Sequence, residues 1–180
     1  MKQERQPFIL YVTGQSTSGK TTLYKSLKRR YQRDASVAVH DIDENGVPKV
    51  GRGHWRLYRV DELLALARGR FELGKSTIIC GITLPHEVIG SECYEPRLNI
   101  HYLMLKLTQK EFDLRIRERL AKAKESNRLG QWKRANNQIA KVIFNQVVNQ
   151  SNHLVLNSAK YSEREIFDYA LEYISEVSGT

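Results

Sequence analysis

The segment Gly14–Thr21 constrains the fold of this chain more than any other feature of its sequence. It reads G-Q-S-T-S-G-K-T and matches the pattern G-x-x-x-x-G-K-[ST]. The apolar run Phe8–Thr13 comes directly before it and predicts a buried strand. Leu23 and Leu27 follow it at helical spacing and predict a helix. The motif therefore lies at a strand-to-helix turn near the N-terminus, which is where a phosphate-binding loop is built.

Each fixed position of this segment, here called the phosphate loop, has a physical reason. Gly14 turns the chain sharply, and Gly19 permits backbone angles and a close approach that a side chain would block. The backbone N–H groups between them, and the start of the helix, favour phosphate oxygens. Lys20 is expected to reach the β- and γ-phosphates, and Thr21 to offer its hydroxyl to Mg²⁺. The predicted nucleotide contacts in this region are Gly14, Gln15, Ser16, Thr17, Ser18, Gly19, Lys20, Thr21 and Thr22. The alternative is a glycine-rich turn before a helix that binds nothing.

Strands and helices alternate along the rest of the sequence. The predicted strands are Phe8–Thr13, Val37–Val39, Ser76–Cys80, Ile100–Leu107 and Leu154–Leu156. The predicted helices are Thr21–Gln32, Val60–Arg68, residues 110–124, Trp132–Val148 and a last one capped by Ser162. Alternation of this kind predicts an α/β fold with a parallel sheet covered on both faces. We therefore expect a three-layer P-loop fold around a five-stranded parallel sheet, in a single domain over residues 1–180. The polar residues near 115–134 are expected to form a short, mobile, lid-like segment.

Composition excludes several classes of protein. No apolar run approaches the roughly 20 residues that span a bilayer, so we expect a cytoplasmic protein without a membrane segment. Cys80 and Cys93 do not form a C-x-x-C pair, and two cysteines cannot make a zinc tetrad. The net charge of +9 favours anionic partners, either nucleotides or nucleic acid.

Two carboxylates follow the second predicted strand. Asp41 and Asp43, here called the acidic pair, come at the side where open α/β sheets bind ligands. Such a pair can hold Mg²⁺ through water, or one member can take the proton of an acceptor hydroxyl. We expect both to be catalytic and Asp43 to serve the metal ion. The alternative is an acidic turn that ends a strand.

Arginines crowd the helix at residues 110–124. Arg115 and Arg119 share a face at i and i+4, and Arg117 lies between them. An arginine over a transferring phosphoryl group stabilises its negative charge. Arg119 is our first candidate for this catalytic task, and Arg128 is a second arginine expected to contact the nucleotide. The alternative is a solvated basic face, which explains most charge runs.

These motifs together resemble those of the small P-loop kinases: shikimate kinase, gluconate kinase and the nucleoside monophosphate kinases. The segment GQSTSGKTTL after FILYVT carries most of the resemblance. Asp41-Ile42-Asp43 is similar to their Asp-x-Asp after the second strand, and Arg119-Leu120 followed by Arg128 is similar to their lid. The close of the chain, LVLNSAKYSEREI, resembles their last strand, adenine-side loop and final helix, which implies that Asn157 contacts the nucleotide base. The third strand departs from the shikimate kinases, because it ends in Cys80-Gly81 where they have a longer glycine run.

The resemblance implies an ATP-dependent phosphotransferase that uses Mg²⁺ and moves the γ-phosphoryl group to a small-molecule or nucleotide acceptor. Arginines suit the capture of a phosphate or carboxylate, so the basic residues after the acidic pair predict an anionic acceptor. These residues are Arg52, His54, Arg56 and Arg59. Trp55 among them can stack on a base or pack in the core. The alternative function is a nucleic-acid-associated P-loop ATPase that uses the basic helix. The oligomeric state stays open.

Overall fold

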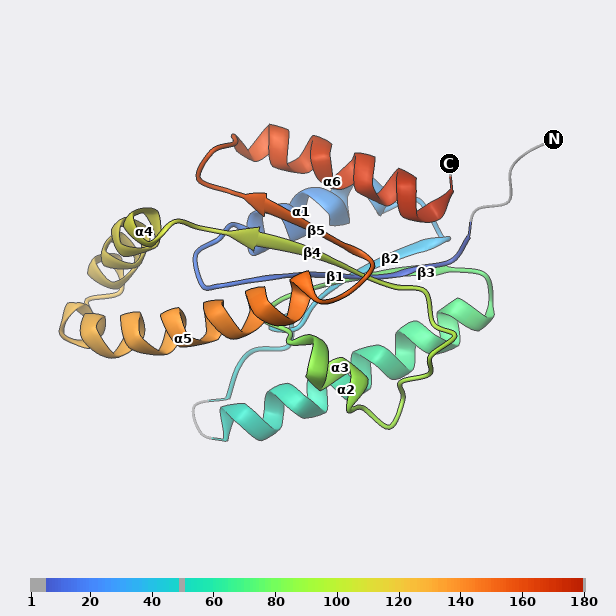
Figure 1. Cartoon of the computed structure of the whole chain (residues 1–180), viewed down its shortest axis with the longest axis horizontal. Helices are drawn as coiled ribbons and strands as arrows, with labels where there is room; N and C mark the ends of the chain where they lie inside the picture. Colours follow the sequence, from blue (N-terminus) through green and yellow to red (C-terminus); the bar gives the residue numbers. More distant parts are fainter. Residues whose placement is uncertain (1–5, 49–50, 180) are drawn as a thin grey trace.

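A single parallel sheet forms the centre of the molecule. The computed structural model describes residues 6–48 and 51–179, with only the backbone of Arg52. The strands are β1 (Ile9–Gly14), β2 (Val37–Asp41), β3 (Ser76–Cys80), β4 (Ile100–Lys106) and β5 (His153–Asn157). They pair in the order β2-β3-β1-β4-β5, and every pair is parallel (Figure 1). The predicted five-stranded parallel sheet is confirmed, with the strand before the phosphate loop at its centre.

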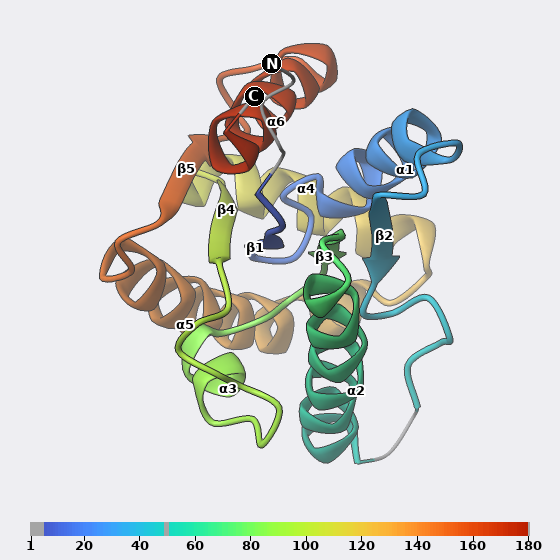
Figure 2. The same cartoon turned by 90° about the vertical axis from the view of Figure 1, so that its right-hand side faces the viewer.

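Helices cover both faces of this sheet. They are α1 (Lys20–Tyr31), α2 (Arg52–Glu72), α3 (Pro85–Ile89), α4 (Gln109–Lys122), the 3₁₀ turn η1 (Ser126–Arg128), α5 (Leu129–Val148) and α6 (Glu163–Ser178). In Figure 2, α1 and α6 lie on one side of the sheet, and α2, α3 and α5 lie on the other. The predicted three-layer arrangement is therefore confirmed.

The residues of β1 explain why its sequence is apolar throughout. Leu10 and Val12 pack into the core under α1 and α6. Ile9 and Tyr11 pack into the core on the opposite face, against α2 and α5. A strand buried on both faces has no polar side to expose, so its sequence is a continuous apolar run rather than an alternating one.

The segment expected to be lid-like folds into helix for most of its length. It includes most of α4, then η1 and the first turns of α5, which project beyond the carboxyl ends of the strands (Figure 1). A separate small core joins these helices. Phe112, Ile116 and Leu120 of α4 are buried there, with Leu129 and Trp132 of α5 packed against them. The polar surface of this segment thus covers an apolar contact between α4 and α5.

Some boundaries differ from those predicted. Helix α2 begins at Arg52 rather than Val60, so most of the basic stretch after the acidic pair is helical. Helix α3 was not predicted, because five residues are too few to show a helical period. Its first turn is instead stabilised by Pro85 at the start and by Glu87, whose carboxylate accepts the N–H of Leu84. No helix in the described part of the chain is long and apolar enough to span a membrane.

Candidate functional site

The phosphate loop leaves β1 in a conformation that only glycine allows at its first position. Gly14 has φ 139°, and a Cβ there would lie 2.2 Å from the carbonyl oxygen of Leu105 on β4. Gly19 has φ 101° where α1 begins. Thr17 also has a positive φ, 63°, which a threonine rarely adopts. The loop is therefore a constrained turn whose shape is imposed by the sheet beside it.

The ammonium group of Lys20 lies across the interior of this loop. Its Nζ donates to the carbonyl oxygens of Gly14 at 2.8 Å and Gln15 at 2.7 Å. Loss of hydration lowers the pKa of Lys20 to about 8, and the carboxylates of Asp43 and Asp41 partly oppose that shift. The lysine side chain thus folds back into the loop, and its ammonium group is bonded to the backbone of the loop itself.

A cleft of about 770 Å³ lies above the loop, at the carboxyl ends of the strands. Residues from the loop, the end of β2, the start of α2, the end of β3, and α4 and α5 line it. The predicted site residues among them are Ser16, Thr17, Ser18, Gly19, Lys20, Thr21, Thr22, Asp41, Asp43, Arg119 and Arg128. Gly14 and Gln15 do not line the cleft, because they form the buried base of the loop.

The two carboxylates of the acidic pair differ in their exposure to solvent. Asp41 ends β2 and is buried, and its Oδ1 accepts the backbone N–H of Asp43 at 2.8 Å. Burial raises the pKa of Asp41, while the N–H of Asp43 partly offsets the rise. Asp43 itself is exposed. Gly81, just after β3, packs closely against Ile42, the residue between the two acids. A Cβ at position 81 would lie 2.8 Å from Cβ of Ile42.

Two arginines of the lid-like segment, Arg119 and Arg128, reach the same cleft and are here called the lid arginines. Nη1 of Arg119 donates to Oγ of Ser16 in the loop at 3.4 Å. Arg128 pairs with Glu125 at 3.1 Å. Both guanidinium groups lie over the ring of Trp132, at 5.8 and 5.9 Å from its centroid. The indole of Trp132 therefore contacts both cations, and Arg119 also reaches the phosphate loop.

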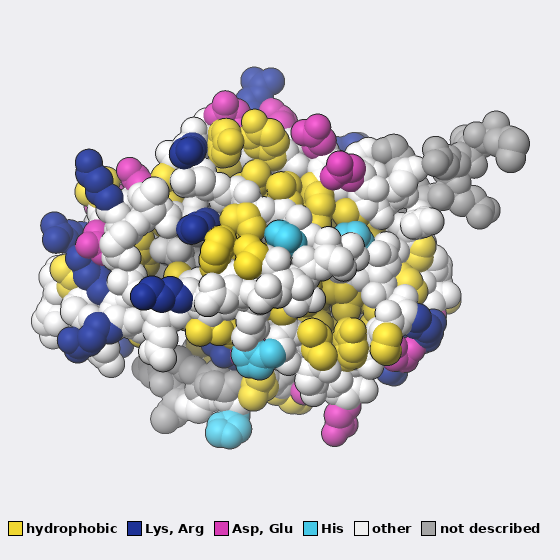
Figure 3. All heavy atoms as spheres, viewed as in Figure 1, with side chains coloured by type: hydrophobic (Ala, Val, Ile, Leu, Met, Phe, Trp, Pro, Cys, Tyr) yellow, Lys and Arg dark blue, Asp and Glu magenta, His cyan; other side chains and the backbone are white. Residues whose placement is uncertain are grey.

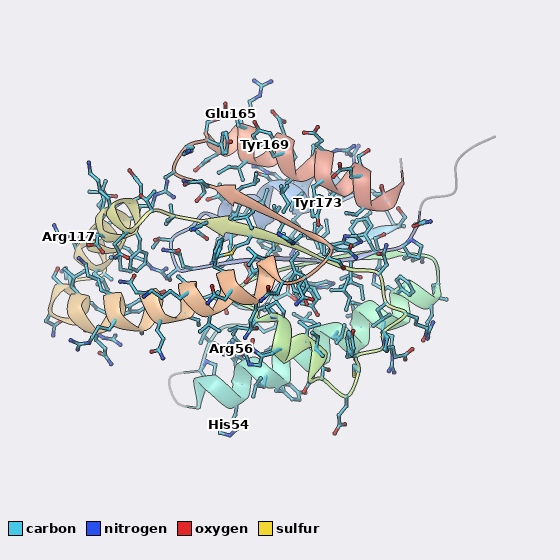
Figure 4. All side chains as sticks on the ribbon, viewed as in Figure 1. His54, Arg56, Arg117, Glu165, Tyr169 and Tyr173 are labelled. Carbon is cyan, nitrogen blue, oxygen red and sulfur yellow. The ribbon has the colours of Figure 1, made fainter. Side chains whose placement is uncertain are left out.

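The other arginines of α4 have different surroundings. Arg115 donates to the carbonyl oxygens of Thr17 at 3.2 Å and Ser158 at 3.4 Å. Arg117 lies on the outer side of α4, away from the cleft (Figure 4). Dark-blue basic side chains gather on the surface at this end of the molecule, around α4 and the start of α5 (Figure 3). The basic helix thus has one face toward the loop and another toward solvent.

The basic residues expected to capture an anion are mostly engaged elsewhere. Arg56 lines the cleft, but its Nε and Nη2 donate to Glu87 at 3.1 and 2.5 Å, and that carboxylate is only 3% exposed. Arg59 is 5% exposed and pairs with Glu62 at 2.5 Å. His54 is exposed and points away from the sheet (Figure 4). The side chain of Arg52 lies outside the described part of the structure.

The expected base contact, Asn157, is also placed differently. It lines neither the large cleft nor a second cavity of about 220 Å³ on the other side of the phosphate loop. Its Oδ1 accepts the N–H of Ala159 and so shapes the turn after β5. The next residue, Ser158, lines the second cavity together with Arg115, Tyr161 and Glu163. The structure therefore places Ser158, rather than Asn157, on the wall of the second cavity.

Sequence reasoning missed the wall that α5 contributes. Trp132, Asn136 and Ile139 line the large cleft at successive turns of that helix. Their spacing gives no signal beyond that of an ordinary amphipathic helix, so they resemble core residues in the sequence. Among the residues described, no three His, Cys, Asp or Glu side chains cluster to hold a metal ion by themselves.

Comparison with known proteins assigns the fold. No protein-family model matches the chain, and no curated protein sequence matches it. Solved structures match over nearly its whole length. A gluconokinase from Sinorhizobium meliloti 1021 has 13% identity and a TM-score of 0.63, covering 97% of this chain and 95% of that one. A sugar kinase from Janibacter sp. HTCC2649 has 14% identity and a TM-score of 0.60, covering 96% and 98%.

The shikimate kinase of Aquifex aeolicus matches in the same way, with 14% identity, a TM-score of 0.55, and coverage of 94% of this chain and 97% of that one. Identities this low establish the architecture and not the reaction. The resemblance expected from the phosphate loop is confirmed at that level: the chain has the three-layer fold of the small P-loop kinases.

Proposed function

We propose that this chain is an ATP-dependent phosphotransferase that moves the γ-phosphoryl group of ATP to a hydroxyl of a small acceptor. One observation carries the proposal. The loop lysine, the acidic pair and a lid arginine, which come from different elements of the fold, line a single cleft at the carboxyl ends of the strands. Phosphoryl transfer needs these three kinds of group in one place. The fold shared with kinases of this size supports the same function.

The nucleotide spans both cavities in this proposal. Its triphosphate lies in the phosphate loop, where Lys20 exchanges the carbonyls of Gly14 and Gln15 for the β- and γ-phosphates. Its base lies in the smaller cavity, which offers the ring of Tyr161 and the carboxylate of Glu163. A carboxylate there can accept a hydrogen bond from the exocyclic amine of adenine. ATP is the nucleotide in this proposal.

The residues at the loop fit a magnesium ion. Thr21 and Asp43 both line the cleft and both are exposed, and hydroxyl and carboxylate oxygens are ligands that Mg²⁺ prefers. The described residues hold no cluster of three acidic or histidine ligands, so phosphate oxygens and water would complete the coordination. When bound, the ion neutralises charge on the β- and γ-phosphates.

The transfer step assigns one task to each remaining group. The acceptor oxygen attacks the γ-phosphorus while the bond to the β–γ bridging oxygen breaks, and ADP leaves with that electron pair. The proton of the acceptor hydroxyl passes to Asp41, because burial raises the pKa of this carboxyl and so makes its carboxylate a stronger base. Arg119 lies by the loop at Ser16 and stabilises the charge on the oxygens of the transferring group.

ADP release from Mg·ATP, measured with a panel of small hydroxyl and nucleotide acceptors, tests this function. We expect at least one acceptor to raise the rate well above the background hydrolysis of ATP. Lys20→Ala should abolish both this rate and the thermal stabilisation by ATP. Asp41→Asn and Asp43→Asn should melt near the wild-type temperature, because their volume is unchanged, yet lose transfer. A full thermal shift in Lys20→Ala at saturating ATP would show that the loop does not bind the nucleotide.

A further inference from the structure

Flat or aliphatic side chains line the large cleft outside the phosphate loop. These residues include Val47, Trp55, Ile82, Trp132, Ala135 and Ile139. They come from the loop after β2, the start of α2, the end of β3 and the inner side of α5. A compound with many hydroxyl groups needs a polar partner for each one, because an unpaired polar group in such surroundings costs free energy. An aliphatic and aromatic wall favours an apolar acceptor body instead.

The charges on this wall do not favour an anion. Arg56 is paired with the buried carboxylate of Glu87, and Arg128 with Glu125. The lysine and the remaining lid arginine lie at the phosphate loop, where the triphosphate requires them. Within the described residues that line the cleft, the charges left without a salt bridge near the acceptor are those of the acidic pair. Asp43 would be neutralised by the magnesium ion of the proposed site, so Asp41 is the carboxylate that would repel an anionic acceptor.

One polar side chain can orient an acceptor on this wall. Asn136 is buried and lines the cleft, and its Nδ2 donates to the carbonyl oxygen of Trp132 at 2.9 Å. It has left for a ligand its amide oxygen, which accepts a hydrogen bond, and the second hydrogen of Nδ2, which donates one. Trp132 already has two arginines against its ring. Trp55 packs partly against the core and also lines the cleft, so it is the aromatic ring that remains for stacking. A nucleobase offers both a flat face and N–H donors on its edge.

We propose that the acceptor is an uncharged alcohol that carries a flat aromatic ring, as a nucleoside does, with the ring against Trp55 and its edge at Asn136. The inference rests on the proposed phosphotransferase activity and names the substrate class of that site. It departs from the anionic acceptor that the basic residues of the sequence suggested. The acceptor hydroxyl points toward the acidic pair, where Asp41 takes its proton as ADP leaves.

Acceptors matched in pairs test this inference. Thymidine, uridine and cytidine would be compared with their 5′-monophosphates, and 2-phenylethanol, glucose, gluconate and shikimate would complete the panel. We expect kcat/KM to be at least tenfold higher for a nucleoside than for its monophosphate and for the compounds without an aromatic ring. Transfer to 2-phenylethanol but not to nucleosides would show that the acceptor is a simple aromatic alcohol rather than a nucleoside. Preference for a monophosphate, glucose, gluconate or shikimate would overturn the inference and leave the phosphotransferase proposal standing.

Substitutions of Trp55 test whether this side chain is responsible for the acceptor preference. Trp55→Leu keeps an apolar residue but removes the flat ring, so the KM of the preferred acceptor should rise at least tenfold while the KM of ATP changes less than twofold. Trp55→Phe should restore most of the loss. Tyr58→Ala, which removes an exposed ring from the same helix, is the matched control and should change neither constant. An unchanged acceptor KM in Trp55→Leu would contradict the stacking role.

A binding measurement separates the two proposals. Calorimetry with thymidine, uridine or cytidine in the presence of Mg²⁺ and a non-hydrolysable ATP analogue should detect saturable binding that Trp55→Leu weakens. If the analogue binds and no nucleoside does, the substrate class is wrong. If the analogue itself does not bind, or if no compound in the panel is phosphorylated, the proposed function is wrong.

Discussion

The guanidinium of Arg115 holds the carbonyl of Thr17 in place, with Nη1 donating to that oxygen at 3.2 Å. Thr17 has φ 63°, a conformation that costs free energy for a threonine and persists only when its surroundings impose it. Nη2 of the same arginine reaches the carbonyl of Ser158, beyond β5, at 3.4 Å. One side chain of α4 therefore connects the phosphate loop to the turn that lines the smaller cavity.

Removal of this connection is expected to weaken nucleotide binding. Arg115→Ala frees the Thr17 carbonyl, so the loop loses part of its shape before the nucleotide arrives. Hydrogen bonds from a charged group are worth about 1.5–3 kcal/mol, reduced here by partial exposure, and we expect the Kd of ATP to rise about tenfold. Calorimetric titration with Mg·ATP measures the change. Arg117→Ala, an exposed arginine of the same helix, should leave the Kd unaltered. Equal effects of the two substitutions would point to net charge rather than to the contact.

Two glycine substitutions are expected to change stability in opposite directions. Gly14→Ala places a Cβ 2.2 Å from the carbonyl oxygen of Leu105 and strains a residue with φ 139°. The sheet and the loop must both shift, so the melting temperature should fall by several degrees or more, and ATP should no longer raise it. Gly69→Ala has open space around it on helix α2 and should stabilise the protein by up to about 1 kcal/mol. Thermal melts of both variants check the pair.

Much of this fold could be predicted from the sequence because its three central strands, β1, β3 and β4, are buried on both faces. Ser76–Cys80 is an apolar run that was predicted as a strand with the bounds observed for β3. The beginning of α2 was not predicted, since the basic residues after Gly51 show no apolar period until Val60. Local periodicity therefore identified an element only where that element carries an apolar face into the core.

The candidate site could be predicted for residues whose chemistry alone indicates a role in binding or transferring phosphate. The phosphate loop, the acidic pair and the lid arginines reach one cleft as expected. Tertiary pairing explains what the sequence could not indicate. Arg56 looked like an anion site until the fold placed Glu87, 31 residues away, against it. Trp132 and Asn136 looked like ordinary helix residues until α5 was placed along the cleft.

The lowered pKa of Lys20 predicts that ATP binding takes up a proton at alkaline pH. The lysine has a pKa of about 8 in the free protein, and an adjacent triphosphate raises it by favouring the charged form. At pH 7 the group is already protonated, so uptake is small, whereas at pH 9 it approaches about 0.9 proton per ATP. The affinity for ATP should accordingly fall as the pH rises above about 8. Calorimetry in buffers of different ionisation enthalpy measures the uptake, and Lys20→Arg, which stays charged, should abolish it.

The same shift predicts a dependence of folding stability on pH. Lys20 has the ordinary lysine pKa of 10.5 in the unfolded chain and a pKa of about 8 in the folded one, so the unfolded chain binds more protons between these values. Stability from this group therefore rises with pH across that window. Urea unfolding from pH 8 to 10 measures this effect. The free energy of unfolding should rise less with pH in Lys20→Met than in the wild type. Identical slopes in the two proteins would mean that the lysine is not desolvated in the fold.

Arg119 separates the phosphotransferase from the alternative of a nucleic-acid-associated ATPase. In the phosphotransferase it lies between Ser16 of the loop and the ring of Trp132, and it acts on the oxygens of the transferring group. Arg119→Ala should then lower kcat at least tenfold while the Kd of ATP changes less than threefold. That division indicates an interaction made mainly in the transition state. Arg117→Ala, on the outer side of α4, should retain the wild-type rate.

A nucleic-acid ATPase predicts the opposite pattern for the same variants, because the basic side chains around α4 and the start of α5 would contact phosphates along a strand (Figure 3). Arg119→Ala and Arg117→Ala would both weaken binding of single-stranded RNA, and each would flatten its salt dependence by about one phosphate contact. Titration of labelled RNA at several salt concentrations, beside the transfer assay, decides between the two. Transfer that survives in Arg119→Ala while RNA affinity falls would assign this helix to nucleic acid. Loss of transfer with no measurable RNA binding in the wild type assigns it to the phosphoryl group.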